Sequence, residues 1–199
     1  MTLALILVGS YLLGAVPTSF LAARYGAGID LRTRGSKNLG ATNVYRVLGW
    51  RYAVPVGAFD IAKGAVPVLL LAPLAGDNAW IPLAAGFSAI LGHVFSVFVR
   101  FQGGKGVATA TGVVLGLAPL AVAASAIVWL AALKLSGFVS LSSILGAVTF
   151  PVAAWFLQAD PYTIWVGIAL SGFIIYTHRA NIHRLMDGTE SRFGRRRET

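Results

Sequence analysis

Residues 107–133 read VATATGVVLGLAPLAVAASAIVWLAAL, and this uncharged run decides how many times the chain crosses a membrane. A helix needs about 20 apolar residues to cross a bilayer, so the run is long for one crossing and short for two. The sequence GLAPL interrupts it, because Pro119 breaks the helical hydrogen-bond ladder and glycine near proline favours a turn. The run is therefore either one kinked span or two short spans that meet near Pro119.

Apolar runs also dominate the rest of the chain. Of its 199 residues, 57% are hydrophobic and 12% are charged, whereas a soluble domain has about 25% charged residues. The first run has no basic segment before it and is longer than the apolar part of a signal peptide, so we expect it to remain as a span. The composition predicts an all-α integral membrane protein. The further runs lie at about 2–25, 52–75, 79–99, 138–158 and 161–178.

The distribution of the 16 Lys and Arg residues favours two spans on either side of GLAPL. With seven spans and the N-terminus outside, the loops 26–51, 100–106 and 134–137 all face the cytoplasm, together with the C-terminal tail. Every basic residue except Lys63 then lies in or beside one of these segments, as the positive-inside rule requires. Six spans would place the 134–137 turn and the tail on opposite sides. We therefore predict seven transmembrane helices, a cytoplasmic C-terminus, and short fourth and fifth spans.

The first polar stretch, RGSKNLGATNVYR at 34–46, combines glycines with hydroxyl, amide and guanidinium groups. Ser, Thr and Asn offer neutral hydrogen bonds, and Arg holds phosphate oxygens through two donors. A helix that begins near Gly40 would add its N-terminal amides to such an anion site. An ordinary solvated loop explains the same residues equally well. The candidate ligand-binding residues are Gly35, Ser36, Asn38, Thr42, Asn43 and Arg46.

Glycines surround a single lysine in the second stretch, FQGGKGVATATG at 101–112. It is no P-loop, because it lacks both the first glycine of that motif and the Ser or Thr after Gly-Lys. Backbone amides at Gly103, Gly104 and Gly106 nevertheless predict an anion nest. Lys105 would add its charge just before a helix begins. The alternative is a turn in which Lys105 only anchors the chain at the membrane surface.

The third stretch, HRANIHRLMDGTE at 178–190, continues the last span. His178 and Asn181 lie three residues apart and so share a helix face, whereas Arg179 lies on another. Gly188 is typical of a helix C-terminus. An amphipathic helix end whose arginines reach the lipid headgroups is the alternative.

Charged residues also occur inside the predicted second span. Asp60 and Lys63 are three residues apart, and charges within a membrane are costly unless they are paired or functional. We predict a mutual ion pair near the cytoplasmic side. His93, in the third span, has no carboxylate nearby in sequence and is interpreted as a hydrogen-bonded core residue. The chain has no cysteine, which excludes disulfides and thiolate metal sites.

Taken in order, GSKNLGATNVYRVLG, DIAKG, LGHVFSVF, FQGGKGVATATG and HRANIHRLMDGTE resemble the successive signatures of the bacterial acyl-phosphate:glycerol-3-phosphate acyltransferases (PlsY type). The resemblance covers nearly the whole chain and implies one transmembrane domain over 1–199 in the bacterial inner membrane. It implies transfer of a fatty acyl group from acyl phosphate to the 1-hydroxyl of sn-glycerol 3-phosphate. The products would be lysophosphatidic acid and inorganic phosphate, in the first step of phospholipid synthesis. It implies no metal cofactor and no nucleic acid, and our working hypothesis is a monomer.

The resemblance also implies roles for individual residues. The residues that match catalytic positions are Ser36, Lys105, His178 and Asn181. Those that match substrate-binding positions are Arg46, Gly103, Gly104, Gly106 and Thr109. Glu190 matches an acidic residue that we interpret as structural. The family often has glycine and proline where this chain has Lys37 and Leu39.

Several alternatives stay open at the level of sequence. The general base is either His178 or the departing phosphate of the donor, and we favour the phosphate. A transporter or channel for a phosphorylated solute would also explain an anion site in a helical bundle. It predicts a polar path to the outer face, where the connections carry Asp77 and Asp160 but no basic residue. From about residue 191 we expect a basic tail that is flexible or lies on anionic headgroups.

Overall fold

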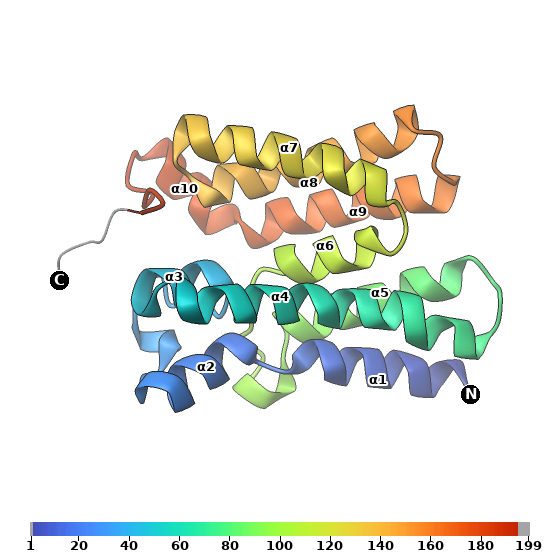
Figure 1. Cartoon of the computed structure of the whole chain (residues 1–199), viewed down its shortest axis with the longest axis horizontal. Coiled ribbons are helices and arrows are strands. Elements are labelled where there is room, and N and C mark those ends of the chain that lie inside the picture. Colours follow the sequence, from blue (N-terminus) through green and yellow to red (C-terminus); the bar gives the residue numbers. More distant parts are fainter. Residues whose placement is uncertain (1, 195–199) are drawn as a thin grey trace. The chain divides into compact units, whose positions relative to one another are not determined.

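In the computed structural model, which describes residues 2–194, every regular element of the described chain is helical (Figure 1). The chain forms two compact units, of which the first ends at Gly116 and the second begins at Leu117. The boundary lies in GLAPL, between α6 (Val107–Leu115) and α7 (Pro119–Ser136). Pro119 is the first residue of α7, a position where a missing N–H costs little. The apolar run at 107–133 therefore belongs to two helices.

Most of the chain is apolar helix. The segments between residues 2 and 194 that are long and apolar enough to cross a membrane are Leu3–Ala27, Trp50–Ala75, Trp80–Val99, Pro119–Ser136 and Val139–Phe156. A shorter apolar helix is α9 (Pro161–Thr177). α6 has only 9 residues, as predicted for the fourth span, but α7 has 18 and is longer than predicted. The multi-pass helical architecture is confirmed, while the count of seven and the sides of the termini stay predictions.

The first unit contains three long helical segments and several short elements. The long segments are α1 (Leu3–Ala15) with α2 (Thr18–Ala27), α4 (Trp50–Val66) with the π-helical η2 (Pro67–Leu71) and the 3-10 turn η3 (Ala72–Ala75), and α5 (Trp80–Val94) with η4 (Val97–Val99). The short elements are η1 (Leu31–Thr33), α3 (Ala41–Leu48) and α6. The helices predicted to begin near Gly40 and just after Lys105 are both present.

Glycines allow the backbones of α1 and α5 to approach closely. A Cβ on Gly14 of α1 would overlap the backbone of Ala89 in α5, and one on Gly92 of α5 would overlap the backbone of Tyr11. Small residues play this part between membrane helices, where lipid is as apolar as the helix surface and close backbone packing drives association. The close contact between α1 and α5 therefore fixes the position of the C-terminal end of α5.

The pair of α4 and α6 follows the same rule. A Cβ on Gly64 would overlap the carbonyl of Thr109, and one on Gly112 would overlap the carbonyl of Ile61. These contacts hold α6 against α4 although α6 is only 9 residues long. The start of α6, and Lys105 before it, is thereby tied to the charged segment of α4.

The second unit consists of α7, α8 (Val139–Phe156), α9 and α10 (Arg179–Met186). Ser171 Oγ of α9 donates to Ala147 O of α8 at 2.6 Å, and Trp129 Nε1 of α7 donates to Ser143 Oγ of α8 at 3.3 Å. Asp160 caps the start of α9. At the start of the basic tail, Phe193 N donates to Gly137 O at 2.7 Å, and the flexibility of the tail stays a prediction. Residues 195–199 of that tail lie outside the described part of the chain.

Candidate functional site

Asn43 organises the first polar stretch. Its side chain is 1% exposed, its Oδ1 accepts the Ser36 N–H at 2.9 Å, and its Nδ2 donates to Arg34 O at 3.1 Å and Asn38 O at 3.0 Å. Gly35 has a φ of 59°, and a Cβ there would overlap Asn43 Oδ1. The polar atoms of this amide are therefore used inside the loop. Asn43 therefore shapes the loop that presents Ser36, and its role in substrate binding stays a prediction.

The residues expected to bind a ligand from this stretch lie around that amide. Ser36 is exposed, whereas Thr42 and Arg46 are half-buried on α3. Gly40 is the N-cap of α3, so the first amides of this helix follow directly after the loop. The helix N-terminus and the loop thus come together as the sequence predicted.

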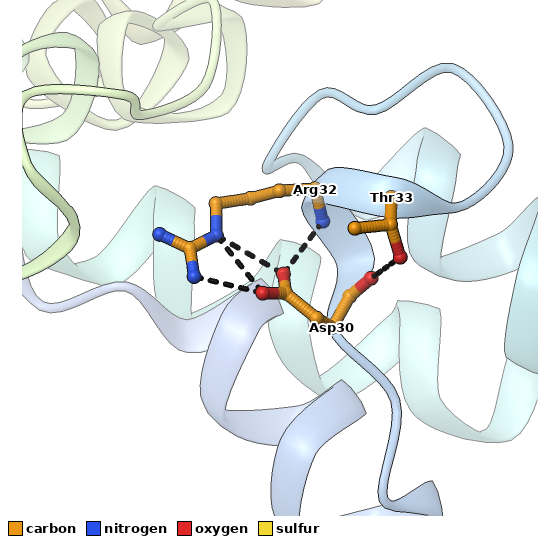
Figure 2. Close-up of polar contacts among 3 residues, drawn as sticks. All are labelled: Asp30, Arg32 and Thr33. Carbon is orange, nitrogen blue, oxygen red and sulfur yellow. Dashed lines mark hydrogen bonds and ion pairs between the residues drawn. The ribbon is translucent and has the colours of Figure 1, made fainter.

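A second contact anchors the start of the same loop. The Arg32 guanidinium donates to the Asp30 carboxylate with a shortest distance of 2.7 Å, and Thr33 Oγ1 donates to Asp30 O at 2.9 Å (Figure 2). The hydrogen bond from the Arg32 side chain, followed by that from the Arg32 backbone, lowers the pKa of Asp30 to about 2. Asp30 is therefore ionised at neutral pH and neutralises Arg32.

The glycine loop differs from the predicted anion nest. The N–H of Gly103 donates to Val94 O at 3.0 Å, and the N–H of Gly104 donates to His93 O at 3.1 Å, both at the C-terminal end of α5. These two amides are consequently not available to an anion, so this part of the prediction is wrong. The glycines serve close packing instead, since a Cβ on Gly103 would overlap His93 O.

At Gly104 the first two polar stretches are in close contact. It is buried, and a Cβ there would overlap both the His93 ring and the carbonyl oxygen of Leu39 in the first loop. Lys105 follows directly and is half-buried, and Gly106 is the N-cap of α6. The anion-binding capacity of this loop therefore rests on Lys105 and the start of α6.

Thr109 lies deeper than the sequence suggested. It is 0% exposed in the first turn of α6, where its carbonyl meets Gly64. Its Oγ1 has no hydrogen-bond partner among residues 2–194. The residue belongs to the α4–α6 packing and not to the loop surface.

The charged pair inside the membrane is formed as predicted. Lys63 Nζ lies 2.8 Å from Asp60 Oδ1, and both side chains are nearly fully buried. A third residue, His93, lies beside this pair, with its Nδ1 3.8 Å from the same carboxylate oxygen. The sequence did not indicate this neighbour. His93 is distant from Asp60 in sequence and shares no local spacing with it. Only the packing of α4 against α5 could reveal the cluster.

In the second unit, His178 stands at the junction of α9 and α10. It is 3% exposed, and its Nδ1 lies 2.8 Å from Ile174 O. A carbonyl oxygen only accepts hydrogen bonds, so Nδ1 carries the proton and Nε2 is the basic nitrogen of the neutral ring. His178 and Asn181 are both buried, and the Asn181 N–H donates to His178 O at 2.8 Å.

Glu190 forms hydrogen bonds with three side chains in and near the third stretch. Its carboxylate accepts from Asn181 Nδ2 at 2.6 Å, Ser140 Oγ at 2.7 Å and Arg184 Nε at 2.6 Å. Burial raises the pKa of Glu190, but these three hydrogen bonds together outweigh burial and lower the pKa below its ordinary value. The predicted structural role of Glu190 fits this arrangement. Arg179 of α10 lies over the ring of Tyr176, at 4.5 Å from its centre, and so contacts the end of α9.

Known proteins resemble this chain over almost its full length. A model of the family described as glycerol-3-phosphate acyltransferase matches residues 4–188. Relatives of that name from Desulforudis audaxviator and Geobacter metallireducens are each 48% identical, over 94% and 95% of this chain and 94% and 96% of their own lengths. The chain belongs to the glycerol-3-phosphate acyltransferase family. It is therefore an enzyme, and its helices are those of an acyltransferase embedded in a membrane.

Two crystal structures agree with this membership. Both are of PlsY, an integral membrane glycerol 3-phosphate acyltransferase, in a glycerol 3-phosphate form and a lysophosphatidic acid form. The first has a TM-score of 0.91 and 38% identity, covering 96% of both chains. The second has a TM-score of 0.89 and 37% identity, covering 96% of this chain and 95% of the other. Between residues 2 and 194 of this acyltransferase, no group of three or more His, Asp and Glu side chains is arranged to hold a metal ion.

Proposed function

We propose that this acyltransferase moves a fatty acyl group from acyl phosphate to the 1-hydroxyl of sn-glycerol 3-phosphate. The products are lysophosphatidic acid and inorganic phosphate. One observation carries the proposal: the similar PlsY structures hold glycerol 3-phosphate in one form and lysophosphatidic acid in the other. These two compounds differ by a single acyl group, so they are the acceptor and the product of one acyl transfer.

The choice of acyl phosphate as donor fits the residues of the polar stretches. Donor and acceptor would both carry phosphate, and the three stretches supply Arg46, Lys105 and hydroxyl and amide groups. Arg and Lys bind phosphate oxygens through charge-assisted hydrogen bonds. We propose that all three stretches lie on the cytoplasmic side, with seven spans and the N-terminus outside. The inner membrane of a bacterium is the expected location.

The proposed reaction needs little covalent help from the protein. The acceptor hydroxyl oxygen attacks the acyl carbonyl carbon, a C–O ester bond forms, and the C–O bond to the donor phosphate breaks. The hydroxyl proton passes to the departing phosphate. An acyl phosphate is already activated, so the site has to align the two reactants and stabilise the oxyanion. We assign the oxyanion contact to Ser36. Lys105, Arg46 and Asn181 bind and align the substrate phosphates.

Purified protein with palmitoyl phosphate and glycerol 3-phosphate tests the proposal by the release of inorganic phosphate. We expect release that depends on glycerol 3-phosphate, with equal amounts of lysophosphatidic acid formed. Replacing Ser36 by Ala should lower turnover, whereas replacing Thr149 by Ala, which removes a hydroxyl bonded within α8, should not. No release that depends on glycerol 3-phosphate would refute the assignment of donor and acceptor.

The choice between His178 and phosphate as base has its own test. If the departing phosphate takes the proton, His178→Gln keeps substantial turnover and the same pH–rate profile. A collapse of kcat at unchanged KM would instead identify His178 as the base. The variant's thermal midpoint should be measured with it, because His178 also donates to Ile174 O.

A further inference from the structure

The first membrane helix is broken, and side chains from other segments donate hydrogen bonds to the carbonyls at the break. α1 ends at Ala15 and α2 begins at Thr18. Ser96 Oγ donates to Ala15 O at 2.5 Å, and Lys63 Nζ donates to Val16 O at 3.0 Å. An unpaired backbone group is strongly unfavourable in hydrocarbon, so the hydrogen bonds from these two side chains stabilise the break.

Asp60 ties the same break to α4. Its Oδ1 accepts from Thr18 Oγ1 at 2.7 Å and pairs with Lys63 at 2.8 Å, and the carboxylate is 2% exposed. Removing one partner of a buried pair leaves an uncompensated charge, so the pair and the break hold each other in place. The carboxylate is therefore a fixed point inside the first unit.

His93 connects this fixed point to the glycine loop. Its Nδ1 lies 3.8 Å from Asp60 Oδ1, and its backbone oxygen accepts the Gly104 N–H. Its ring fills the place that a side chain at Gly104 would occupy. Beside the ring lies a cavity of about 10 Å³, lined among others by Lys63 and Gly103, which has room for about one water. The ring thus lies beside a buried carboxylate on one side and packs against the loop at Gly104 on the other.

We propose that His93 is a positioning residue of this acyltransferase: held beside the buried Asp60–Lys63 pair, it fixes the Gly103–Gly104 turn and thereby places Lys105. Lys105 directly follows the turn, so a change in the backbone at Gly104 moves the base of the lysine side chain. Displacements near 1 Å can lower rates about 100-fold when a group must meet a substrate accurately. His93 itself contacts no substrate in this scheme.

The proposed role of His93 predicts a change in KM. This kinetic test rests on the proposed function. The phosphate of either substrate carries its charge before and during reaction, so a misplaced Lys105 weakens ground-state binding and raises KM. A purely structural defect lowers the fraction of folded enzyme. It therefore lowers apparent kcat and leaves the KM of the surviving molecules unchanged.

Three variants test the proposal in the purified full-length enzyme. Lys105→Met first shows which substrate, acyl phosphate or glycerol 3-phosphate, has the raised KM. We expect His93→Ala to raise the KM of that same substrate about tenfold, within the range for misplaced groups. His93→Gln replaces the imidazole by an amide of similar reach, so we expect a smaller rise. An unchanged KM in His93→Ala, or a rise for the other substrate only, would overturn the proposal.

Ser88→Ala is the matched control on α5. Ser88 Oγ donates to Leu7 O at 2.7 Å and so links α5 to α1 without contact to the glycine loop. We expect its thermal midpoint to fall while both KM values stay at the wild-type level. An equal rise of KM in Ser88→Ala would show that loss of α5 packing, and not the place of His93, causes the effect.

A second readout needs no substrate and separates this proposal from the donor assignment. Amide hydrogen exchange of residues 101–106 should be faster in His93→Ala than in the wild type and unchanged in Ser88→Ala. Equal exchange in all three proteins would overturn the proposal whatever the enzyme acylates. Absence of phosphate release by the wild type, with faster exchange in His93→Ala, would refute only the proposed function.

Discussion

Lys37 illustrates how one residue's backbone explains a departure from a family pattern. Its φ of 61° lies in the left-handed region, which glycine adopts without cost. The family often has glycine at this position, and this chain keeps the conformation with a lysine. The backbone next to Ser36 therefore keeps the left-handed conformation, which lysine adopts only at a cost.

Replacing Lys37 by Gly should stabilise the protein. Relief of the left-handed conformation gains about 1–2 kcal/mol, and the added freedom of the unfolded chain costs about 0.4–1 kcal/mol. We expect a net gain of roughly 0.5–1 kcal/mol in the free energy of unfolding, measured by thermal unfolding in detergent. Lys37→Ala removes the charge but keeps the conformation, so it should bring no gain. If Lys37→Ala stabilised as much as Lys37→Gly, charge repulsion and not backbone strain would be the cause.

At the scale of elements, helix pairs meet through glycines, and clusters of hydrogen bonds fix the helix ends. Gly14 and Gly92 set the α1–α5 contact, and Gly64 and Gly112 set the α4–α6 contact. The end of α10 is held by the carboxylate of Glu190. Each of these features can be tested against a matched position in the same chain.

The α1–α5 contact predicts opposite effects for two glycines of one helix. In Gly14→Ala the new methyl group meets the backbone of Ala89, which cannot move aside as a side chain can, so we expect a loss of about 1–3 kcal/mol. Gly9 has nothing within 4 Å of a Cβ, so Gly9→Ala should be neutral or stabilising by up to about 1 kcal/mol. Both are measured as thermal midpoints in detergent. Equal destabilisation by the two changes would contradict the close-approach argument.

The hydrogen bonds to Glu190 predict a pH dependence in the second unit. Its pKa is lower in the folded chain than its ordinary value of 4.5, so its contribution to stability is complete above about pH 4.5 and is lost as pH falls through the lowered pKa. We expect residues 188–193 to exchange amide hydrogens faster as pH drops below that value, after correction for intrinsic rates. Glu190→Gln should lack this dependence. Asp30, whose pKa is about 2, lies in the first unit and contributes equally to both proteins.

At the scale of the whole molecule, the topology is the main remaining prediction. The seven-span scheme places the connection at Asp77 outside and the turn at Lys134 inside, and both residues are exposed. The chain has no cysteine, so single cysteines can be introduced without a background. In spheroplasts, a maleimide that cannot cross the membrane should label Asp77→Cys at once. It should label Lys134→Cys only after permeabilisation, whereas a six-span chain would expose both sites.

Local sequence signals predicted much of the fold. Apolar runs indicated the membrane helices, GLAPL indicated the break between α6 and α7, and the i, i+3 spacing indicated the Asp60–Lys63 pair. These features depend on neighbours within a few residues, so the chain carries them in its order of residues. The length of α7 was underestimated because Lys134 and Ser136 continue the helix beyond the apolar run.

By itself, the sequence determined the helices, the turns and which polar residues were candidates for chemistry. The tertiary structure decided how those residues are used. It showed that the Gly103 and Gly104 amides are bonded to the end of α5, that Asn43 serves its own loop, and that His93 stands beside Asp60. The physical reason is that hydrogen-bond partners and close backbone approaches join segments distant in the chain. Which donor meets which acceptor depends on how the helices pack, and no local pattern records it.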